Sequence, residues 1–214
     1  MMDAYCERTA SGIFGEPFNA ASNLAFFLAA WLCWRMARRR DTADPGVCVL
    51  IALIAALGAG STIFHVFHTR FTQLFDAGPI FLFQVAFLWI YSRRVFNFSA
   101  GLTMLVLSGF LASMWMCAFF HGLLNNSLVY APALVMMIVY GIVTAATKKN
   151  ERLFLFLGAA AFFFSLVFRT IDMLICPCFP VGTHFLWHIF NSVMLCFVMR
   201  ALIVNAAPAS RQPS

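Results

Sequence analysis

The chain has 214 residues, of which 63% are hydrophobic and only 10% are charged, and its mean hydropathy is +0.87. Soluble domains carry about 25% charged residues, so the composition excludes a soluble globular protein and predicts a polytopic membrane protein. The formal net charge of +6 does not indicate nucleic-acid binding, because the basic residues form short clusters between apolar stretches. The N-terminus lacks the basic start and apolar core of a cleavable signal peptide, so we expect none.

Seven apolar stretches are long enough to be membrane-spanning helices, since about 20 apolar residues cross the hydrocarbon core of a bilayer. The third stretch is the shortest, and breaker residues such as Pro45 and Gly46 separate neighbours. We therefore predict an all-α membrane protein with a seven-transmembrane helix bundle as a single domain (1–205), followed by a disordered cytoplasmic tail (206–214). The expected spans are Phe18–Trp34, Val47–Phe67, Ala77–Tyr91, Leu102–Phe119, Leu128–Thr147, Leu153–Ile175 and Thr183–Val204.

The basic residues predict the orientation of this bundle. With the N-terminus outside and the C-terminus inside, only Arg8, Arg70 and Arg169 of the 14 Lys and Arg residues lie on or near the outer side. An excess of Lys and Arg in inner loops is the rule for membrane proteins. The short basic loops suit a bacterial inner membrane, and an endomembrane is the alternative.

Five reactive side chains are expected at one depth in the outer half of the bilayer. Ser61 and His65 are one helical turn apart near the outer end of the second span. Asp76 begins the third span at the same surface, and His184 and His188 lie in the first two turns of the seventh. Because Lys and Arg alone defined the topology, this convergence is independent support for a shared site.

Zinc suits these residue types. Buried imidazoles and carboxylates are costly at membrane depth unless something pairs them, and a single buried histidine is more often a hydrogen-bonded structural residue. Three imidazoles and a water make the open tetrahedral site of catalytic zinc, although imidazole also binds iron and copper. We predict Zn²⁺ on His65, His184 and His188, with Asp76 as the general base and Ser61 as a donor to an oxyanion.

At these residues the chain resembles the alkaline ceramidases, within the CREST superfamily of seven-helix membrane hydrolases and receptors. The resemblance implies a zinc-dependent amide hydrolase that cleaves the N-acyl bond of ceramide or a related lipid to a fatty acid and a sphingoid base or amine. The resemblance implies no protein partner. Because CREST relatives include receptors, the alternative is a non-enzymatic lipid receptor or sensor with a structural zinc. The matching segments are Tyr5–Arg8 with Glu16–Phe27, the SxxxH of Ser61 and His65 followed by Asp76, and the HxxWH of His184, Trp187 and His188.

The resemblance also implies an N-terminal Ca²⁺ site, which this chain matches only in part. Glu7 and Glu16 fit the pattern, and Asp3 lies one residue away from the position of a further ligand. These three residues are possible calcium ligands; the alternative is a solvated acidic N-terminus, or Glu16 capping the first helix. The positions that depart from the family pattern of Asp, Trp and Asn are Ala4, Tyr5 and Thr9, respectively.

Cys6 and Cys176 fall on the same outer face under this topology, and Asp172 with Cys176 is a weaker echo of the family pattern. An oxidising, periplasm-like compartment would favour a Cys6–Cys176 disulfide, which would tie the N-terminal segment over the mouth of the bundle. Cys178 is the competing partner.

Asn19, Ser22 and Asn23 in the first span have two interpretations. They either hydrogen-bond between packed helices or support the metal ligands.

Overall fold

The computed structural model describes residues 5–10, 12 and 14–206. Asp3 and Ala4, together with residues 207–214 of the expected tail, lie outside these residues. Within the described part of the chain every regular element is a helix, and seven spans are long and apolar enough to cross a membrane. The predicted all-α, seven-helix class is thus confirmed. The elements are α1 (Pro17–Ser22), α2 (Leu24–Arg39), α3 (Pro45–Phe67), α4 (Arg70–Arg94), α5 (Ala100–Ala118), the 3₁₀ segment η1 (Leu123–Tyr130), α6 (Ala131–Ala146), α7 (Phe154–Ile175) and α8 (His184–Asn205).

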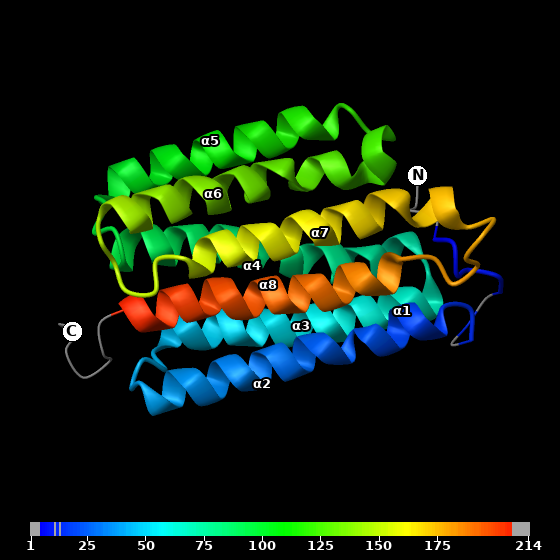
Figure 1. Cartoon of the computed structure of the whole chain (residues 1–214), viewed down its shortest axis with the longest axis horizontal. Coiled ribbons are helices and arrows are strands. Elements are labelled where there is room, and N and C mark those ends of the chain that lie inside the picture. Colours follow the sequence, from blue (N-terminus) through cyan, green and yellow to red (C-terminus); the bar gives the residue numbers. More distant parts are fainter. Residues whose placement is uncertain (1–4, 11, 13, 207–214) are drawn as a thin grey trace.

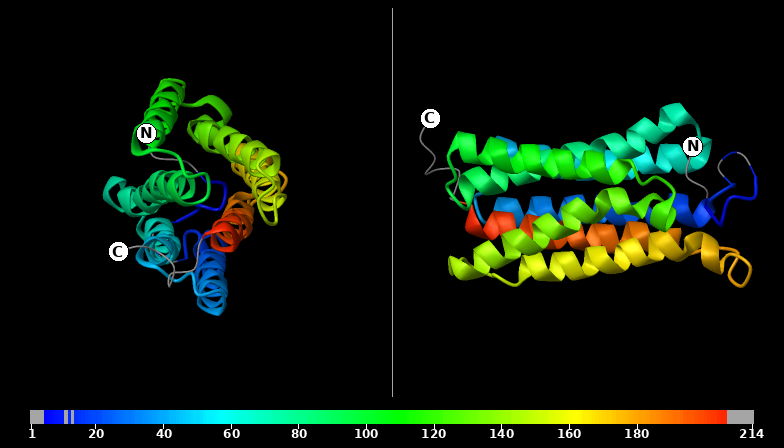
Figure 2. Two further views of the ribbon diagram at one scale, coloured as in Figure 1. Left: turned by 90° about the vertical axis from the view of Figure 1, so that its left-hand side faces the viewer. Right: turned by 90° about the horizontal axis from the view of Figure 1, so that it is seen from above.

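The long helices form a ring when the bundle is viewed along its axis (Figure 2). Each helix packs against its neighbour in the sequence, and α8 closes the ring against α2. The spans of α3 and α8 are the most buried, whereas that of α5 is the least. The N-terminal segment, α1, the turn from α3 to α4 and the start of α8 all lie at one end of the bundle (Figure 1).

Local capping explains where α3 and α4 begin. The Asp44 carboxylate accepts hydrogen bonds from the backbone N–H groups of Gly46 (2.9 Å) and Val47 (3.3 Å), ahead of which Pro45 occupies the first turn. Thr69 and Thr72 form a capping box at the start of α4.

This capping corrects one boundary. The third span was expected to start at Ala77, but the capping box starts the helix at Arg70, so Asp76 lies at the end of its second turn. The polar first turns of α4 hid this start from an interpretation based on hydropathy alone. The third span is consequently among the longest in the described chain.

A glycine brings α3 and α4 together beside two of the predicted catalytic residues. A Cβ at Gly60 would lie 1.9 Å from the carbonyl oxygen of Phe75, so only glycine permits this backbone approach. Ser61 follows Gly60 on α3, and Asp76 follows Phe75 on α4. The close contact therefore places the two helices so that Ser61 and Asp76 face a common space.

The opposite end of the bundle is a packed apolar core with few polar groups. Leu50, Met199 and Leu202 are fully buried there. Two pairs of buried hydroxyl groups join helices in this half: Tyr91 Oη lies 3.1 Å from Thr144 Oγ1, and Ser92 Oγ lies 2.5 Å from Tyr140 Oη. The reactive polar groups are thus concentrated at the other end.

Candidate metal centre

Three histidines from two helices meet at one end of the bundle. His65 lies in the last turn of α3, and His184 and His188 lie in the first two turns of α8, each exposing 2% or less of its surface. One ring nitrogen from each lies within 4.8 Å of the others. The three nitrogens are thus near enough to share one ion, and imidazole nitrogens bind zinc at about 2.0–2.1 Å.

Hydrogen bonds orient two of the three rings. The Nδ1 atom of His65 lies 2.5 Å from Oε2 of Glu16, and Nδ1 of His188 lies 2.7 Å from Oγ of Ser22. The Ser22 hydroxyl donates its proton to the carbonyl oxygen of Asn19 (2.9 Å), so His188 must donate its Nδ1–H to Ser22. In both rings Nδ1 is engaged, which leaves Nε2 as the metal-binding atom.

His184 supports the metal assignment in a different way. Its Nδ1 atom is buried and has no hydrogen-bond partner among the described residues. An unsatisfied polar atom in an apolar interior is unfavourable by about 1–3 kcal/mol, and a metal ion bound by this cluster would relieve the penalty. The three side chains therefore fit a bound transition-metal ion.

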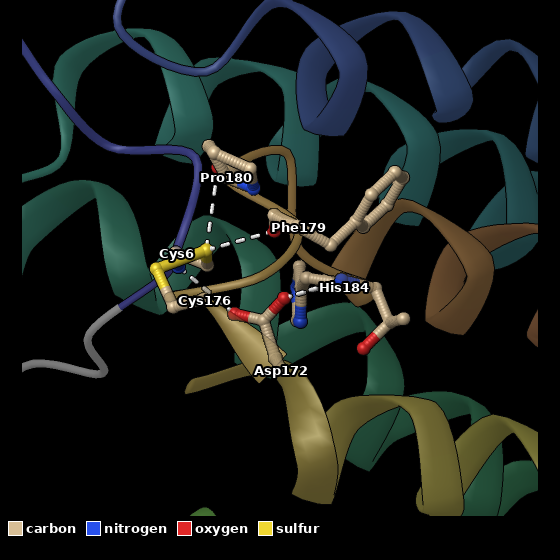
Figure 3. Close-up of a disulfide and its surroundings, with 7 residues drawn as sticks. Cys6, Asp172, Cys176, Phe179, Pro180 and His184 are labelled. Atoms are coloured by element: carbon tan, nitrogen blue, oxygen red, sulfur yellow. Dashed lines mark hydrogen bonds between the residues drawn. A yellow bond between two sulfur atoms is a disulfide. The ribbon is translucent and has the colours of Figure 1, made fainter. Parts of the chain in front are cut away.

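Asp172 fixes the start of the helix that carries two of these ligands. Its carboxylate accepts the backbone N–H groups of Thr183 (2.7 Å), His184 (2.9 Å) and Cys6 (3.0 Å), as Figure 3 shows in part. A Cβ at Gly182, whose φ is +68°, would lie 2.2 Å from Asp172 Oδ1. Glycine is thus required for the loop to reach this carboxylate and enter α8 at the observed angle.

A disulfide joins Cys6 to Cys176 and holds the N-terminal segment against the same loop (Figure 3). Their Cα atoms are 5.3 Å apart, and Cys178, which the sequence left as an alternative partner, is an exposed free thiol. The neighbouring Tyr5 ring lies over the metal ligands, with its centroid 4.2 Å from that of His184 and 5.0 Å from that of His65. The N-terminal segment therefore covers the histidine cluster.

Ser61, Asp76 and His188 line one central cavity. Ser61 Oγ is buried and accepts or donates no hydrogen bond within the described residues, while Asp76 is half-buried. Below this polar end the walls are almost entirely apolar and extend along the bundle axis. Lining side chains on that stretch include Leu57, Phe83, Phe87, Phe110, Met136, Leu155, Met194 and Val198.

Two glutamates expected to bind calcium have other partners. Both oxygens of Glu7 accept backbone N–H groups at the start of α1, from Phe18 (2.6 Å) and Asn19 (2.8 Å). Glu16 is fully buried and contacts His65 instead. Burial raises the pKa of the Glu7 carboxyl and that of the Glu16 carboxyl above their ordinary value. The hydrogen bonds that the two carboxyls accept oppose this shift.

Sequence reasoning missed the roles of Glu16 and Arg169. Glu16 was interpreted as a possible calcium ligand or as a cap of the first helix, whereas it lies against the His65 ring, and a carboxylate is a natural partner for a metal-bound imidazole. The buried Arg169 guanidinium lies over the rings of Tyr130 (5.6 Å) and Trp187 (5.4 Å), both of which line the cavity. Cation–π contacts with these two rings therefore stabilise the buried charge of Arg169.

A closed ring of seven helices that are long and apolar enough to span a membrane, with a buried tri-histidine cluster, defines a class of intramembrane proteins in which one end of the bundle could hold a metal ion. The sequence model of the Ceramidase family matches residues 3–213, nearly the whole chain, and the chain belongs to this family. Membership implies a membrane-embedded amide hydrolase with a lipid substrate. No match was found among curated proteins.

Proposed function

We propose that this protein is a zinc-dependent amide hydrolase that cleaves the N-acyl bond of ceramide or a related N-acyl lipid, releasing a fatty acid and a sphingoid base or amine. The observation that carries the proposal is the convergence of His65, His184 and His188, the last of which lines the polar end of a long apolar cavity. Ser61 and Asp76 line that same cavity beside His188.

Each side chain has a distinct role in this reaction. When bound, zinc supplies an activated water as the nucleophile at neutral pH. Asp76 would take a proton from the attacking water as its oxygen bonds to the carbonyl carbon, and would deliver that proton to the nitrogen as the C–N bond breaks, which gives the carboxylic acid and the amine. The Ser61 hydroxyl donates to the carbonyl oxygen of the substrate as negative charge develops on it.

The cavity suits a lipid with one polar group near its end. One end is lined by the polar side chains of Ser61, Asp76 and His188, and the rest of the wall is almost entirely apolar. An acyl chain can lie along the apolar walls of the bundle while its amide reaches the histidines. Long apolar substrates partition into the bilayer and would meet such a site laterally.

The placement in the membrane is part of the proposal. The distribution of Lys and Arg favours an N-terminus outside and a C-terminus inside. This orientation puts the histidine cluster in the outer half of the bilayer. The disulfide between Cys6 and Cys176 at this end agrees with an oxidising outer compartment. A bacterial inner membrane meets both conditions.

Release of labelled fatty acid from ceramide by the purified protein in detergent micelles tests the proposal. We expect release to stop on treatment with 1,10-phenanthroline and to return when zinc is restored. His188→Ala should lose both the metal and the activity, whereas the matched variant His121→Ala, at an exposed histidine, should keep both. A wild type that contains no zinc, or that hydrolyses ceramide equally well after chelation, would contradict the zinc mechanism.

A further inference from the structure

The N-terminal segment contributes a positive charge to the surroundings of the metal ligands. Arg8 is two residues beyond Cys6, whose disulfide anchors the segment, and its Nε atom lies 3.1 Å from Oε1 of Glu16. Oε2 of the same carboxylate lies 2.5 Å from Nδ1 of His65. Arg8, Glu16 and His65 thus form a continuous chain of contacts from the N-terminal segment to a metal ligand.

Two of the carboxylates at this end of the bundle have their hydrogen bonds supplied by the backbone, whereas Oε1 of the third, Glu16, has only ion-pair contacts. Glu7 accepts two backbone N–H groups and Asp172 accepts three. The contacts of Glu16 are all to nitrogen atoms: His65 Nδ1, Asn19 Nδ2 (3.0 Å), Arg8 Nε and His68 Nδ1 (3.3 Å). The last two are ion-pair contacts rather than well-aligned hydrogen bonds.

These surroundings do not fit the calcium ion that the family resemblance implies. Calcium takes six to eight oxygen ligands at about 2.3–2.6 Å, whereas Glu16 is surrounded by nitrogen donors and Glu7 has both oxygens in backbone hydrogen bonds. Thr9, at the position of the expected Asn ligand, is exposed to solvent. Among the described residues, the atoms that contact these two carboxylates are therefore nitrogen donors, while the buried Oδ1 atom of Asn19 accepts no hydrogen bond.

We infer that the Arg8 guanidinium serves as a built-in cation in place of Ca²⁺, and that Arg8 is a positioning residue for the metal centre. It holds the Glu16 carboxylate, which in turn fixes the Nδ1–H of His65 and presents Nε2 of that ring to the metal. This inference rests on the proposed function only in requiring that the three histidines bind zinc.

A calcium ion can leave its site, whereas the Arg8 guanidinium cannot. A calcium ion dissociates when its free concentration falls below its dissociation constant, which reaches about 10⁻⁴–10⁻³ M for extracellular sites. A guanidinium is always charged and is attached covalently to the chain. The chain is thus expected to hold His65 in place at any calcium concentration.

The zinc affinity of Arg8→Gln tests the positioning role. Loss of groups that hold metal ligands in place typically weakens metal affinity by about 10–100-fold, and we expect a weakening in this range by competition with a chromophoric chelator. Arg8→Lys should recover much of the affinity. Arg70→Gln removes an exposed arginine at the same end of the bundle and should leave affinity unchanged. Thermal unfolding of each variant checks that it is folded.

Calcium binding to the wild type, measured with radioactive Ca²⁺ by equilibrium dialysis, tests the replacement without any substrate. We expect no bound ion at about 1 mM Ca²⁺, the weak limit of extracellular sites. One equivalent of bound Ca²⁺, or wild-type zinc affinity in folded Arg8→Gln, would overturn the inference. A wild type that binds no zinc would overturn the proposed function and the positioning role together, and the calcium measurement would still decide whether Arg8 replaces the ion.

Discussion

Ser22 Oγ lies 2.7 Å from Nδ1 of His188, although the two residues are 166 positions apart in the sequence. Ser22 ends α1, and its hydroxyl also donates to the carbonyl oxygen of Asn19. The proton on Nδ1 of His188 is therefore directed at Ser22, and Nε2 is directed at the other histidines. The first helix thus selects the tautomer of a ligand on the last helix.

We expect Ser22→Ala to weaken zinc binding by about 10–100-fold, because the His188 ring loses the acceptor that fixes its orientation. Ser22→Thr keeps the hydroxyl and should keep most of the affinity. Ser113→Ala removes a half-buried serine of α5 whose hydroxyl bonds only its own helix, and serves as the matched control. Equal affinities for Ser22→Ala and Ser113→Ala would show that the hydrogen bond does not orient the ligand.

Asp76→Asn separates an enzyme from a lipid sensor. Asparagine is nearly isosteric but cannot accept the proton of water, so we expect zinc content to stay at the wild-type value while kcat falls by about 10²–10⁴-fold. Asp41→Asn, at an exposed turn beyond the end of α2, should have wild-type kcat. Metal-loaded wild-type protein without any amide release, even from a broad set of N-acyl lipids, would favour the sensor.

Ser61→Ala should have a smaller and kinetically distinct effect. Loss of one oxyanion donor typically lowers kcat by about 10²–10³-fold, or about 2.7–4 kcal/mol of transition-state stabilisation. Because the Ser61 hydroxyl is buried at the cavity wall and has no other hydrogen-bond partner among the described residues, its removal should barely change stability. A rise in KM at constant kcat would instead assign Ser61 to ground-state substrate binding.

The sequence predicted that His65, His184 and His188 lie together, because a helical spacing and a charge rule agree on their placement. His184 and His188 are one turn apart on one helix, and the positions of Lys and Arg bring His65 to the same depth. Nothing local to Ser22 or Glu16 indicates which imidazole each contacts. Those hydrogen bonds depend on how α1 packs against α3 and α8, and tertiary packing of this kind has no periodic signal.

The start of α4 shows a different limit. Hydropathy placed the boundary at Ala77, yet Thr69 and Thr72 cap a helix from Arg70 onward. Thr69 and Thr72 are capping residues that can be recognised in the sequence. A search for apolar stretches nevertheless passes over the first two turns, because these contain polar residues. Asp76 was still assigned to the correct end of the bundle, because the nearly two helical turns that precede it change its depth by only about 9 Å.

The disulfide between Cys6 and Cys176 is expected to stabilise the fold. The two cysteines are 170 positions apart, and closing a long loop typically contributes about 2–4 kcal/mol. Cys6→Ser should therefore lower the midpoint of thermal unfolding, as should reduction of the wild type, while Cys178→Ser should leave it unchanged because that thiol is exposed and free. Identical midpoints for Cys6→Ser and Cys178→Ser would mean that the crosslink adds nothing to stability.

An ion pair at the opposite end of the bundle predicts a pH dependence of stability. Arg200 donates to both oxygens of Glu151, from Nε (2.6 Å) and Nη2 (2.8 Å), and holds the pKa of this carboxyl below its ordinary value of 4.5. A carboxyl whose pKa is lower in the folded state stabilises the fold fully above its unfolded pKa, and loses that contribution as pH falls through the folded pKa. The Glu151 side chain is 27% exposed and that of Arg200 is 40% exposed. Solvent therefore screens the ion pair, and its effect on stability should be small.

We therefore expect the thermal midpoint of the wild type to fall more steeply than that of Glu151→Gln as pH drops from about 5 to about 3. Above pH 5 the wild type should be the more stable of the two, because the charged pair is intact there. High salt, which shortens the screening length to about 3 Å at 1 M, should bring the two curves together. Parallel curves at low salt would show that Glu151 titrates equally in the folded and unfolded chains, and that the contacts with Arg200 carry no net stabilisation.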